Sequence, residues 1–372
     1  MPVSPADGED FAREVGALYQ DAEAGLLERL ARALADGIGL PNWAERKLRA
    51  IGNLRTAVAE TTSALRRDAD GAIRHAVQQA YQRGDQAAVA DLMLPEGLRA
   101  AALRDLPNAR AVDRLANAAV VEQGPVYQRI LRVVPDAYRR IVARVSGSVL
   151  LGTQTRQQVA QRALDQFADR GITGFVDRSG RAWDMASYAE MATRSVTGRA
   201  AVQGHTDRLE AMGQRLVIVS DAPLECPLCR PWEGAILSLS GNPGDRTATM
   251  PHATRDGHPV RVDIAGSLEE ARAAGLMHPN CRHSISLYLP GVTTPATSPP
   301  HPGGATYEDT QHQRYLERQV RMWKRRQAVA IDDQATRLAG QKVREYQRRI
   351  RELTAEKQLP RKSAREQIGF AR

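Results

Sequence analysis

Two short stretches, CPLC at residues 226–229 and HPNC at residues 278–281, contain the residues around which part of this chain is expected to fold. Each holds two metal-binding side chains with two residues between them, a spacing that lets both donors of a tight turn share one ion. All three cysteines of the chain belong to these two pairs, and three cysteines cannot build a disulfide framework. The spacing therefore predicts a metal site formed by Cys226, Cys229, His278 and Cys281.

The number of donors indicates the kind of metal site. Three cysteines and one histidine are a usual set for structural zinc, whereas a catalytic zinc keeps one position open for water. Four protein donors leave no such position, so we expect a structural zinc ion. The alternative is three buried or free cysteines without metal. His252, His258 and His283 are further imidazoles that could substitute as donors or support them.

Three short apolar runs surround the two pairs and predict strands. Residues 216–219 and 235–239 are almost fully apolar, and residues 285–289 alternate between apolar and polar side chains. The polar, Gly- and Pro-rich residues 241–260 between them predict an exposed loop. Residues 215–291 are therefore expected to form a small α+β domain around the metal.

The chain before this domain reads as helices. Apolar residues recur at three- and four-residue steps from residue 10 onward, with breaks expected at residues 37–41 and at Gly84, Pro125 and Pro135. We expect a helical N-terminal region over 1–148. A helix–hairpin–helix region should follow over 149–214, with its β-hairpin at 171–183 turning at Ser179-Gly180.

The last part of the chain carries most of its positive charge. Residues 292–305 form a Pro-rich linker, and residues 306–372 are expected to be a basic helical tail with one long helix from Tyr307 to about Leu359. Residues 301–372 hold 17 Lys and Arg against 9 Asp and Glu, so they account for +8 of the formal net charge of +9. Such a terminal segment is typical of proteins that contact nucleic acid, although a solvated arginine-rich helix has the same composition. The contact residues predicted here are Arg321, Lys324, Arg325, Arg326, Arg348 and Arg349.

A heptad pattern in the second half of that helix predicts a packing face. Thr336, Ala339, Val343, Tyr346, Ile350 and Leu353 follow one another at alternating three- and four-residue steps. The pattern fits pairing with another helix and equally fits packing on the rest of this protein.

Composition sets the fold class and excludes several functions. With 42% hydrophobic and 5% aromatic residues, the chain is expected to be mainly α, with a small α+β zinc-containing subdomain and a long C-terminal helix. The sequence has no run of 18 apolar residues, so we expect no transmembrane helix, and we expect no secretory signal. Motifs for phosphate loops, dinucleotide binding and serine hydrolases are absent from the sequence, so we expect neither an enzyme nor a small-molecule substrate.

Several of these stretches together resemble a known family. CPLCRPWEG at 226–234, ILSLSG at 236–241 and GLMHPNCRHSISLYL at 275–289 are similar to segments of the minor capsid (minor head) proteins of tailed bacteriophages, relatives of Mu-type head morphogenesis proteins. Residues 171–183, 187–194 and 313–326 fit the same pattern. The resemblance extends over most of the chain and is strongest from about 135 to 330.

The resemblance implies a virion component at the capsid interior or the portal vertex. It implies portal and capsid proteins as partners, contact with packaged DNA, and assembly in the bacterial cytoplasm. Cys226, Cys229, His278 and Cys281 carry over as the metal positions, and Arg282 and His283 complete the motif. Many relatives lack one or both of the first cysteines, so the metal prediction depends on the spacing.

Two other functions use the same residue types. An HNH-like zinc nuclease would need a His, an Asn and a second His, but His278, Asn280 and His283 span only six residues and His278 is assigned to the metal. A host zinc-containing nucleic-acid-binding protein would be expected to carry a basic face on its long helical half. Residues 1–300 instead have a net charge of +1.

Overall fold

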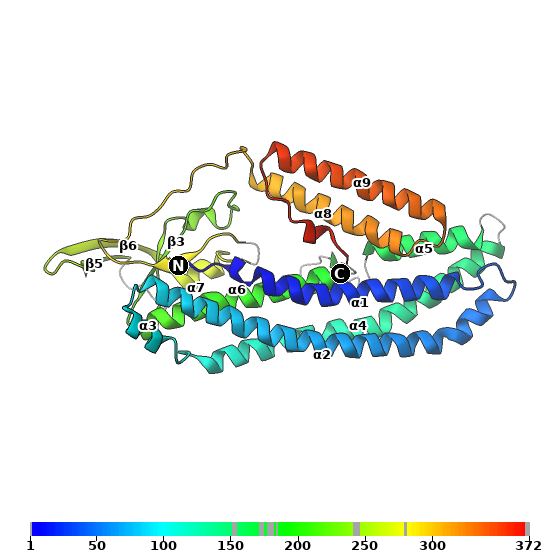
Figure 1. Ribbon diagram of the computed structural model, residues 1–372, viewed down its shortest axis with the longest axis horizontal. Coiled ribbons are helices and arrows are strands. Elements are labelled where there is room, and N and C mark those ends of the chain that lie inside the picture. The colour runs from blue at the N-terminus through cyan, green and yellow to red at the C-terminus, as the bar shows by residue number, and fades with distance from the viewer. Residues whose placement is uncertain are drawn as a thin grey trace. The chain divides into compact units, whose positions relative to one another are not determined.

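The computed structural model describes residues 2–150, 155–170, 175–176, 182–183, 185–240, 246–278 and 281–368. It is mainly helical with a small sheet, so the expected fold class is confirmed (Figure 1). The chain forms two compact units. The sheet unit comprises Met1–Arg13, Ala72–Val120 and Met191–Tyr307, and the helical unit comprises Glu14–Gly71, Val121–Glu190 and Glu308–Arg372. None of the described helices combines the length and the hydropathy needed to cross a membrane.

The helices and strands follow one another in a simple order. The α-helices are α1 (Glu9–Ala35), α2 (Trp43–Asp91), α3 (Glu96–Ala102), α4 (Ala109–Leu150), α5 (Arg156–Arg170), α6 (Met185–Ala211), α7 (Leu268–Ala273), α8 (Tyr307–Ala328) and α9 (Asp333–Glu356). The strands are β1 (Phe175–Val176), β2 (Ala182–Trp183), β3 (Leu216–Val219), β4 (Ile236–Ser238), β5 (Thr247–Pro251), β6 (Pro259–Ser267) and β7 (Ile285–Leu287). Short 3-10 helices cover Pro5–Gly8 (η1), Arg230–Trp232 (η2) and Ser363–Glu366 (η3).

The expected hairpin is confirmed where the structure describes it. β1 and β2 pair antiparallel, with Phe175 opposite Trp183. The predicted turn at Ser179-Gly180 lies outside the described residues.

The sheet unit is built on a five-stranded sheet in the order β5-β6-β4-β3-β7. β3 is antiparallel to both β4 and β7, and β6 runs parallel to β4 and antiparallel to β5. Every residue of β3 is buried because both of its faces contribute to a core. Val217 and Val219 belong to the large core shared with α2, α4 and α6, and Leu216 and Ile218 to a smaller core on the other face.

Residues 246–260 are not simply the exposed loop that composition predicted for 241–260, and residues 241–245 lie outside the described part of the chain. From Thr247 onward they form β5 and the start of β6, an antiparallel hairpin that extends the sheet (Figure 1). Ala248 and Met250 are half-buried against the smaller core, while their neighbours Thr247, Thr249 and Pro251 are exposed. This alternation of half-buried and exposed residues is typical of a strand with one covered face. The many polar and Pro residues of the segment made its composition resemble that of a loop, so the strand was not predicted.

The helix break expected at Gly84 is wrong, because α2 continues through this residue. Gly84 lies where α2 and α6 approach each other most closely. A Cβ atom at Gly84 would lie 1.8 Å from the Ala201 carbonyl oxygen, and one at Gly204 would lie 2.1 Å from the Tyr81 carbonyl oxygen. The two backbones approach so closely that only glycine fits at either position. Nearby, the buried Arg208 donates a 2.7 Å hydrogen bond to Asp85 and fixes the same pair of helices.

The breaks expected at Pro125 and Pro135 are also wrong, because α4 runs through both prolines. Proline removes one intrahelical hydrogen bond and frees the carbonyl four residues earlier. Those carbonyls belong to Val121 and Leu131, whose residues are 74% and 44% exposed, so water can satisfy them.

Buried aromatic side chains connect the helices of the helical unit. The Tyr19 and Tyr127 hydroxyls lie 2.8 Å apart, and Tyr127 donates a hydrogen bond to Asp70. Trp43 is buried and its indole N–H donates to the Leu34 carbonyl at 3.0 Å, which closes the turn between α1 and α2. These bonds satisfy polar groups that burial would otherwise leave unpaired.

The expected single C-terminal helix is two helices, α8 and α9, which pack side by side (Figure 1). The Asp332 carboxylate accepts a 2.7 Å hydrogen bond from the Ala335 N–H and begins α9 as an N-cap. Val343 and Ile350 of the heptad face pack against Leu316 and Val320 of α8. The heptad pattern therefore marks packing within this protein.

Candidate metal centre and basic surface

Strand pairing brings the two donor pairs together although 48 residues separate them. Cys226 and Cys229 follow the end of β3, and His278 and Cys281 precede β7. Val219 and Ile285 are opposite each other in the antiparallel register, and the Ser220 N–H extends the pairing with a 2.9 Å bond to the Ser284 carbonyl. The segments beyond both strands are therefore adjacent.

Each donor pair is closed by a tight turn. The Cys229 N–H donates to the Cys226 carbonyl at 3.1 Å, and the Cys281 N–H donates to the His278 carbonyl at 2.8 Å. Such a turn directs its two side chains to the same side. Residues 279–280, inside the second pair, lie outside the described part of the chain.

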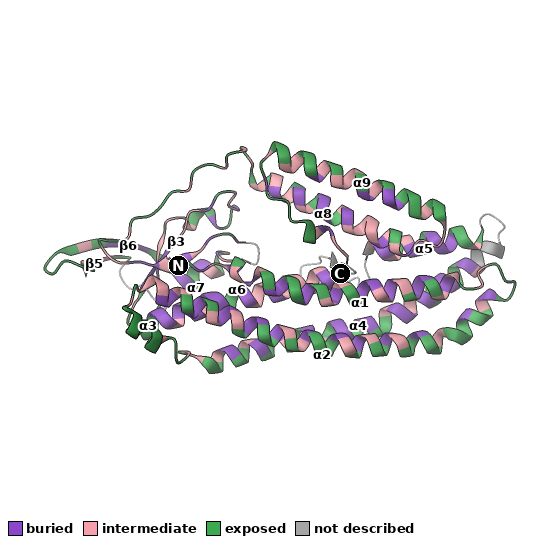
Figure 2. Cartoon of the chain, viewed as in Figure 1, coloured by how far each residue is buried: buried purple, intermediate pink, exposed green. Residues whose placement is uncertain are grey.

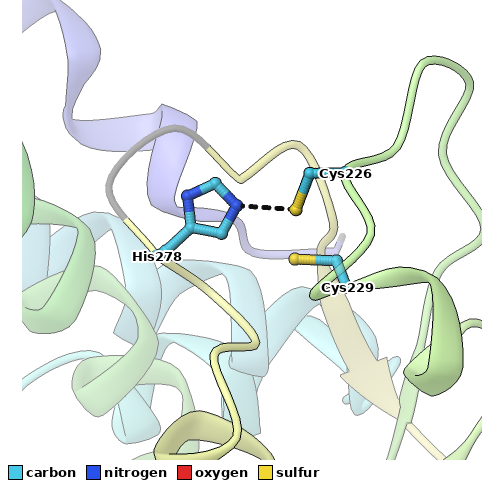
Figure 3. Close-up of side chains that lie close together, drawn as sticks. All are labelled: Cys226, Cys229 and His278. Atoms are coloured by element: carbon cyan, nitrogen blue, oxygen red, sulfur yellow. Dashed lines mark hydrogen bonds between the residues drawn. The ribbon is translucent and has the colours of Figure 1, made fainter. Parts of the chain in front are cut away.

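The side chains form two overlapping groups of three, and within each group the ligand atoms lie within 4.8 Å of one another; neither group contains all four predicted donors. The first group is Cys226, Cys229 and His278, whose side chains face one another in Figure 3, and the second is Cys229, Cys281 and His283. Cys229 belongs to both, so all four predicted donors lie in one connected cluster.

The distances within the cluster match a metal site. Cys226 Sγ lies 3.0 Å from His278 Nε2, and Cys229 Sγ lies 3.5 Å from Cys281 Sγ. A tetrahedral zinc with bonds of about 2.3 Å to sulfur has sulfur–sulfur edges of about 3.8 Å. The donor chemistry and the spacing therefore fit a metal ion. Cys226, Cys229 and Cys281 are all buried, as a closed structural site requires.

The two thiols that lie closest together differ in proton affinity. The hydrogen bond with Cys229 lowers the pKa of Cys281 to about 4, and His283 adds to this effect. The same contact with Cys281, together with burial, raises the pKa of Cys229. The lowered pKa of Cys281 favours its thiolate form, which is the form that binds metal.

His283 and Arg282, the two other motif residues, have different surroundings. His283 is buried, with Nδ1 3.4 Å from Cys281 Sγ and Nε2 2.8 Å from Glu233 Oε1. Burial alone would lower the pKa of His283, but its hydrogen bonds with Cys281 and Glu233 raise it. Arg282 is exposed and belongs to neither donor group. His252 and His258 lie on the β5–β6 hairpin and belong to neither donor group.

The four basic residues predicted on α8 are engaged within the helical unit. Arg325 is buried and its Nε donates to the Ala168 carbonyl at 2.8 Å, while Arg326 binds both carboxylate oxygens of Asp169. Arg321 donates to the Arg365 carbonyl and Lys324 to the Gln367 side chain.

The two predicted residues on α9 are more open. Arg348 is exposed and forms an ion pair with Glu352, and Arg349 lies over the Tyr346 ring. The burial colours in Figure 2 show exposed residues along α9.

Comparison with known proteins identifies the family. A family model described as "Phage minor capsid protein 2" matches residues 3–355. The chain belongs to this minor capsid protein family. It is also 26% identical over 270 residues, covering 71% of this chain and 69% of the relative, to a protein described as "Structural protein" of Lactococcus phage LL-H. No solved structure matches the chain.

Family membership confirms the resemblance read from the sequence. A phage minor capsid protein is a structural protein with capsid-related partners.

Two features of the minor capsid protein were missed by the sequence analysis. Glu233 holds His283 and accepts a 3.3 Å hydrogen bond from the Ala222 N–H, and only its place four residues after Cys229 could have suggested it. The second feature is a row of exposed arginines on α9, at Arg337, Arg344, Arg348 and Arg351. Their steps of seven, four and three residues mark one helix face, so the heptad reading that identified the packed face could also have identified this one.

Proposed function

We propose that this minor capsid protein is an architectural component of the phage head whose sheet unit is fixed by one structural zinc ion. The proposal rests on one observation: donor side chains from two distant segments lie in direct contact at the end of the β3–β7 pair. Cys226, Cys229, His278 and Cys281 would hold the ion, which would crosslink the two segments. Four protein donors leave no open position for a reacting water.

Metal analysis of the purified full-length chain tests the zinc ion. We expect one zinc per chain in the wild type, and loss of at least half of it in Cys229→Ser, because Cys229 belongs to both donor groups. Arg282→Ala, at an exposed neighbouring position, is the matched control and should keep its zinc. A wild-type protein purified under reducing conditions without zinc would overturn this proposal.

The two histidines of the cluster decide which donor set is used. In the proposed set His278 is a donor, whereas His283 is not a donor and contacts the donor Cys281 from outside. His278→Gln should therefore lose zinc, whereas His283→Gln should retain one ion with weaker binding. The opposite result would assign the site to Cys229, Cys281 and His283 and would leave room for a water molecule on the metal. Plasmid cleavage in Mg²⁺ or Mn²⁺, abolished in His283→Ala, would then support the nuclease alternative.

Location in the particle is the second part of the proposal. We place the protein at the capsid interior or the portal vertex, with portal and capsid proteins as partners, and its assembly in the bacterial cytoplasm. Family membership supports a capsid-related role. Mass spectrometry of purified tail-less heads, followed by crosslinking, should detect the protein and crosslinks to the portal. Its presence in isolated tails and not in heads would contradict this location.

The third part of the proposal is contact between packaged DNA and the arginine row of α9. This row replaces most of the residues predicted from the sequence, since those on α8 are bonded within the protein. The row extends over 14 residue steps from Arg337 to Arg351, or about 21 Å of helix. Its arginines lie on the face opposite the apolar contacts with α8, where they can reach the phosphate backbone.

Salt dependence of duplex binding tests the arginine row. Four phosphate contacts predict a slope of about −3.6 for log K against log salt, at about 0.9 per contact. Arg337→Gln/Arg344→Gln/Arg351→Gln should reduce the slope to about −1. The control, Arg46→Gln/Arg55→Gln/Arg67→Gln, removes the same charge from exposed positions of α2 and should leave the slope unchanged. Equal slopes for both triple variants would exclude α9 as the contact surface.

A further inference from the structure

The sheet unit contains a cavity of about 490 Å³ between α6 and the segment that leads from α7 to His278. This volume lies within the range of about 300–1,000 Å³ that is typical of small-ligand sites. Its charged lining residues are Arg194 and Arg199 of α6 and Glu269 and Arg272 of α7. We call this cavity the arginine pocket.

The walls of the arginine pocket are fixed by close backbone contacts. A Cβ atom at Gly198 would lie 3.0 Å from Pro5 Cα, so α6 touches the N-terminal segment directly at the pocket. Ser267 and Glu270 form a capping box at the start of α7, the helix that carries Glu269 and Arg272, with the Glu270 N–H donating to Ser267 Oγ at 3.0 Å. The pocket is therefore shaped by the fold itself.

The charges of the arginine pocket are unbalanced. Arg199 and Arg272 share the described lining with one acid, Glu269, and the neighbouring Glu270 uses its carboxylate to accept a 2.8 Å hydrogen bond from the Ser267 N–H. Among the residues that the structure describes, neither Arg199 nor Arg272 has an ion-pair partner. Burial, and next the positive charge of Arg199, lower the pKa of Arg272. Guanidinium groups keep their charge, so the pocket holds repelling cations.

We infer that the arginine pocket binds a phosphate-bearing ligand. Planar guanidinium groups bind phosphate oxygens in pairs, and two arginines on different helices can bind one group from two sides. A DNA duplex is too wide for a cavity of this volume. The ligand is therefore a small phosphate compound or the terminal phosphate of a nucleic-acid strand, which share the same recognition chemistry.

Calorimetric titration of the zinc-loaded full-length chain with pyrophosphate tests the inference. We expect one saturable site. Arg199→Gln/Arg272→Gln should weaken binding at least tenfold, and Arg215→Gln/Arg255→Gln, which removes two exposed arginines of the same unit, should change it less than twofold. Glu269→Gln should strengthen binding two- to threefold because, among the described lining residues, Glu269 is the only acid. This opposite effect cannot come from a loss of folding.

A second arm of the titration distinguishes the two ligand sources. Inorganic phosphate is compared with a tetranucleotide that carries a 5′-phosphate and with the same tetranucleotide ending in a 5′-hydroxyl. A preference for the phosphorylated strand assigns the pocket to strand ends, and equal weak binding of both strands assigns it to the small compounds.

Two results would overturn the inference. One is the absence of a saturable signal, and the other is equal weakening in the variant and control pairs. Zinc content is measured after each titration, so that metal stripping by pyrophosphate is not mistaken for binding. His278, a proposed zinc donor, also lines the pocket, so the zinc content shows whether a variant has disturbed the metal site. Arg199 and Arg272 themselves are neither metal donors nor part of the α9 row, so their effect on binding is distinguishable from the zinc and DNA proposals.

Discussion

Single glycines set how closely α2 and α6 pack in the sheet unit. Gly84 and Gly204 each face a backbone carbonyl of the other helix, and the space for a side chain is absent at both positions. Gly71, in the same helix α2, has nothing within 4 Å of the place where its Cβ would lie. Two glycines of one helix therefore have opposite physical roles.

Alanine substitutions should separate these roles. Gly84→Ala should lower the free energy of unfolding by about 3 kcal/mol, because its Cβ would overlap the Ala201 carbonyl and force the helices apart. Gly71→Ala is the control and should raise the stability by up to about 1 kcal/mol, since alanine favours an exposed helix. Urea denaturation followed by circular dichroism measures both. Equal effects would show that α2 and α6 do not touch at Gly84.

Glu366 should make the stability of the helical unit sensitive to acid. Burial alone would raise the pKa of Glu366, but hydrogen bonds from Arg361 and Gln347 lower it below the ordinary value of 4.5. A carboxyl group whose pKa is lowered in the folded state makes its full contribution to the free energy of unfolding at pH values above its unfolded-state pKa. That contribution is lost as the pH falls through the folded-state value.

A pH series of thermal melts tests this contribution. At pH 7 we expect Glu366→Gln to lower the free energy of unfolding by about 1–2 kcal/mol, because the hydrogen bonds from the charged Arg361 to residue 366 are weakened. The difference from wild type should shrink below pH 4.5. Glu356→Gln, at a 72% exposed side chain, should follow the wild type throughout. A difference independent of pH would contradict the role of the Glu366 charge.

The clustering of the proposed metal donors was predictable from the sequence, whereas the contact of Glu233 with His283 was not. Two pairs with fixed spacing predict Cys226, Cys229, His278 and Cys281 because the spacing itself carries the turn geometry. Glu233 meets His283 only after β3 and β7 have paired, and no local pattern encodes that contact. Residues that act through tertiary contacts are therefore the part of the site that sequence reasoning misses.

At the scale of elements, α8 and α9 form a pair held by a small apolar core. Leu316 and Val320 of α8 meet Val343 and Ile350 of α9, with Trp323, Tyr346 and Leu353 at the margin. The heptad spacing predicted this face but left its partner open. The predicted single helix was too long, because Asp332 caps the start of a second helix within a stretch whose composition is helical throughout.

Truncation of one core residue should measure this pairing. Ile350 is fully buried, and Ile350→Ala should cost about 3 kcal/mol through lost burial and the cavity that remains. Leu338→Ala changes a side chain of the same helix that is 50% exposed, and should cost less than about 0.5 kcal/mol. Urea melts of the two variants make the comparison. Similar costs would mean that α9 does not pack through its heptad face.

The β5–β6 hairpin shows why some elements escape sequence patterns. Within the stretch expected to be a loop, only Ala248, Met250 and Val260 pack against the smaller core, and they are half-buried, so few apolar residues mark the strands there. Val262 and Ile264, further along β6, are buried in the same core. Pairing with β4 through the long strand β6 gives the hairpin its stability, and this is a contact between distant segments. Local composition alone favoured a loop.

For the molecule as a whole, the proposed zinc ion should stabilise only one of the two units. All four donors lie in the sheet unit, and none lies in the helical unit. Hydrogen–deuterium exchange with and without a strong chelator, under reducing conditions, tests this. Exchange should increase in residues 216–238 and 281–289 and stay constant in α8 and α9. A uniform increase, or none near β3 and β7, would contradict the expected role of the metal.

The two units also differ from the consecutive regions that composition suggested. Each unit combines three separate stretches of chain, and the boundaries fall within helices α1, α2, α4 and α6 and at the start of α8. Helical periodicity does not change at such a boundary, so a scan along the chain has no signal for it.

This interleaving restricts how related phages could exchange parts of the gene. Replacing one whole unit by that of a relative requires crossovers at all five boundaries, after residues 13, 71, 120, 190 and 307. A single crossover would instead join halves of helices from different parents, and their glycine and apolar contacts would have to match by chance. We therefore expect this gene to be inherited as one block, with variation accumulating by point substitution.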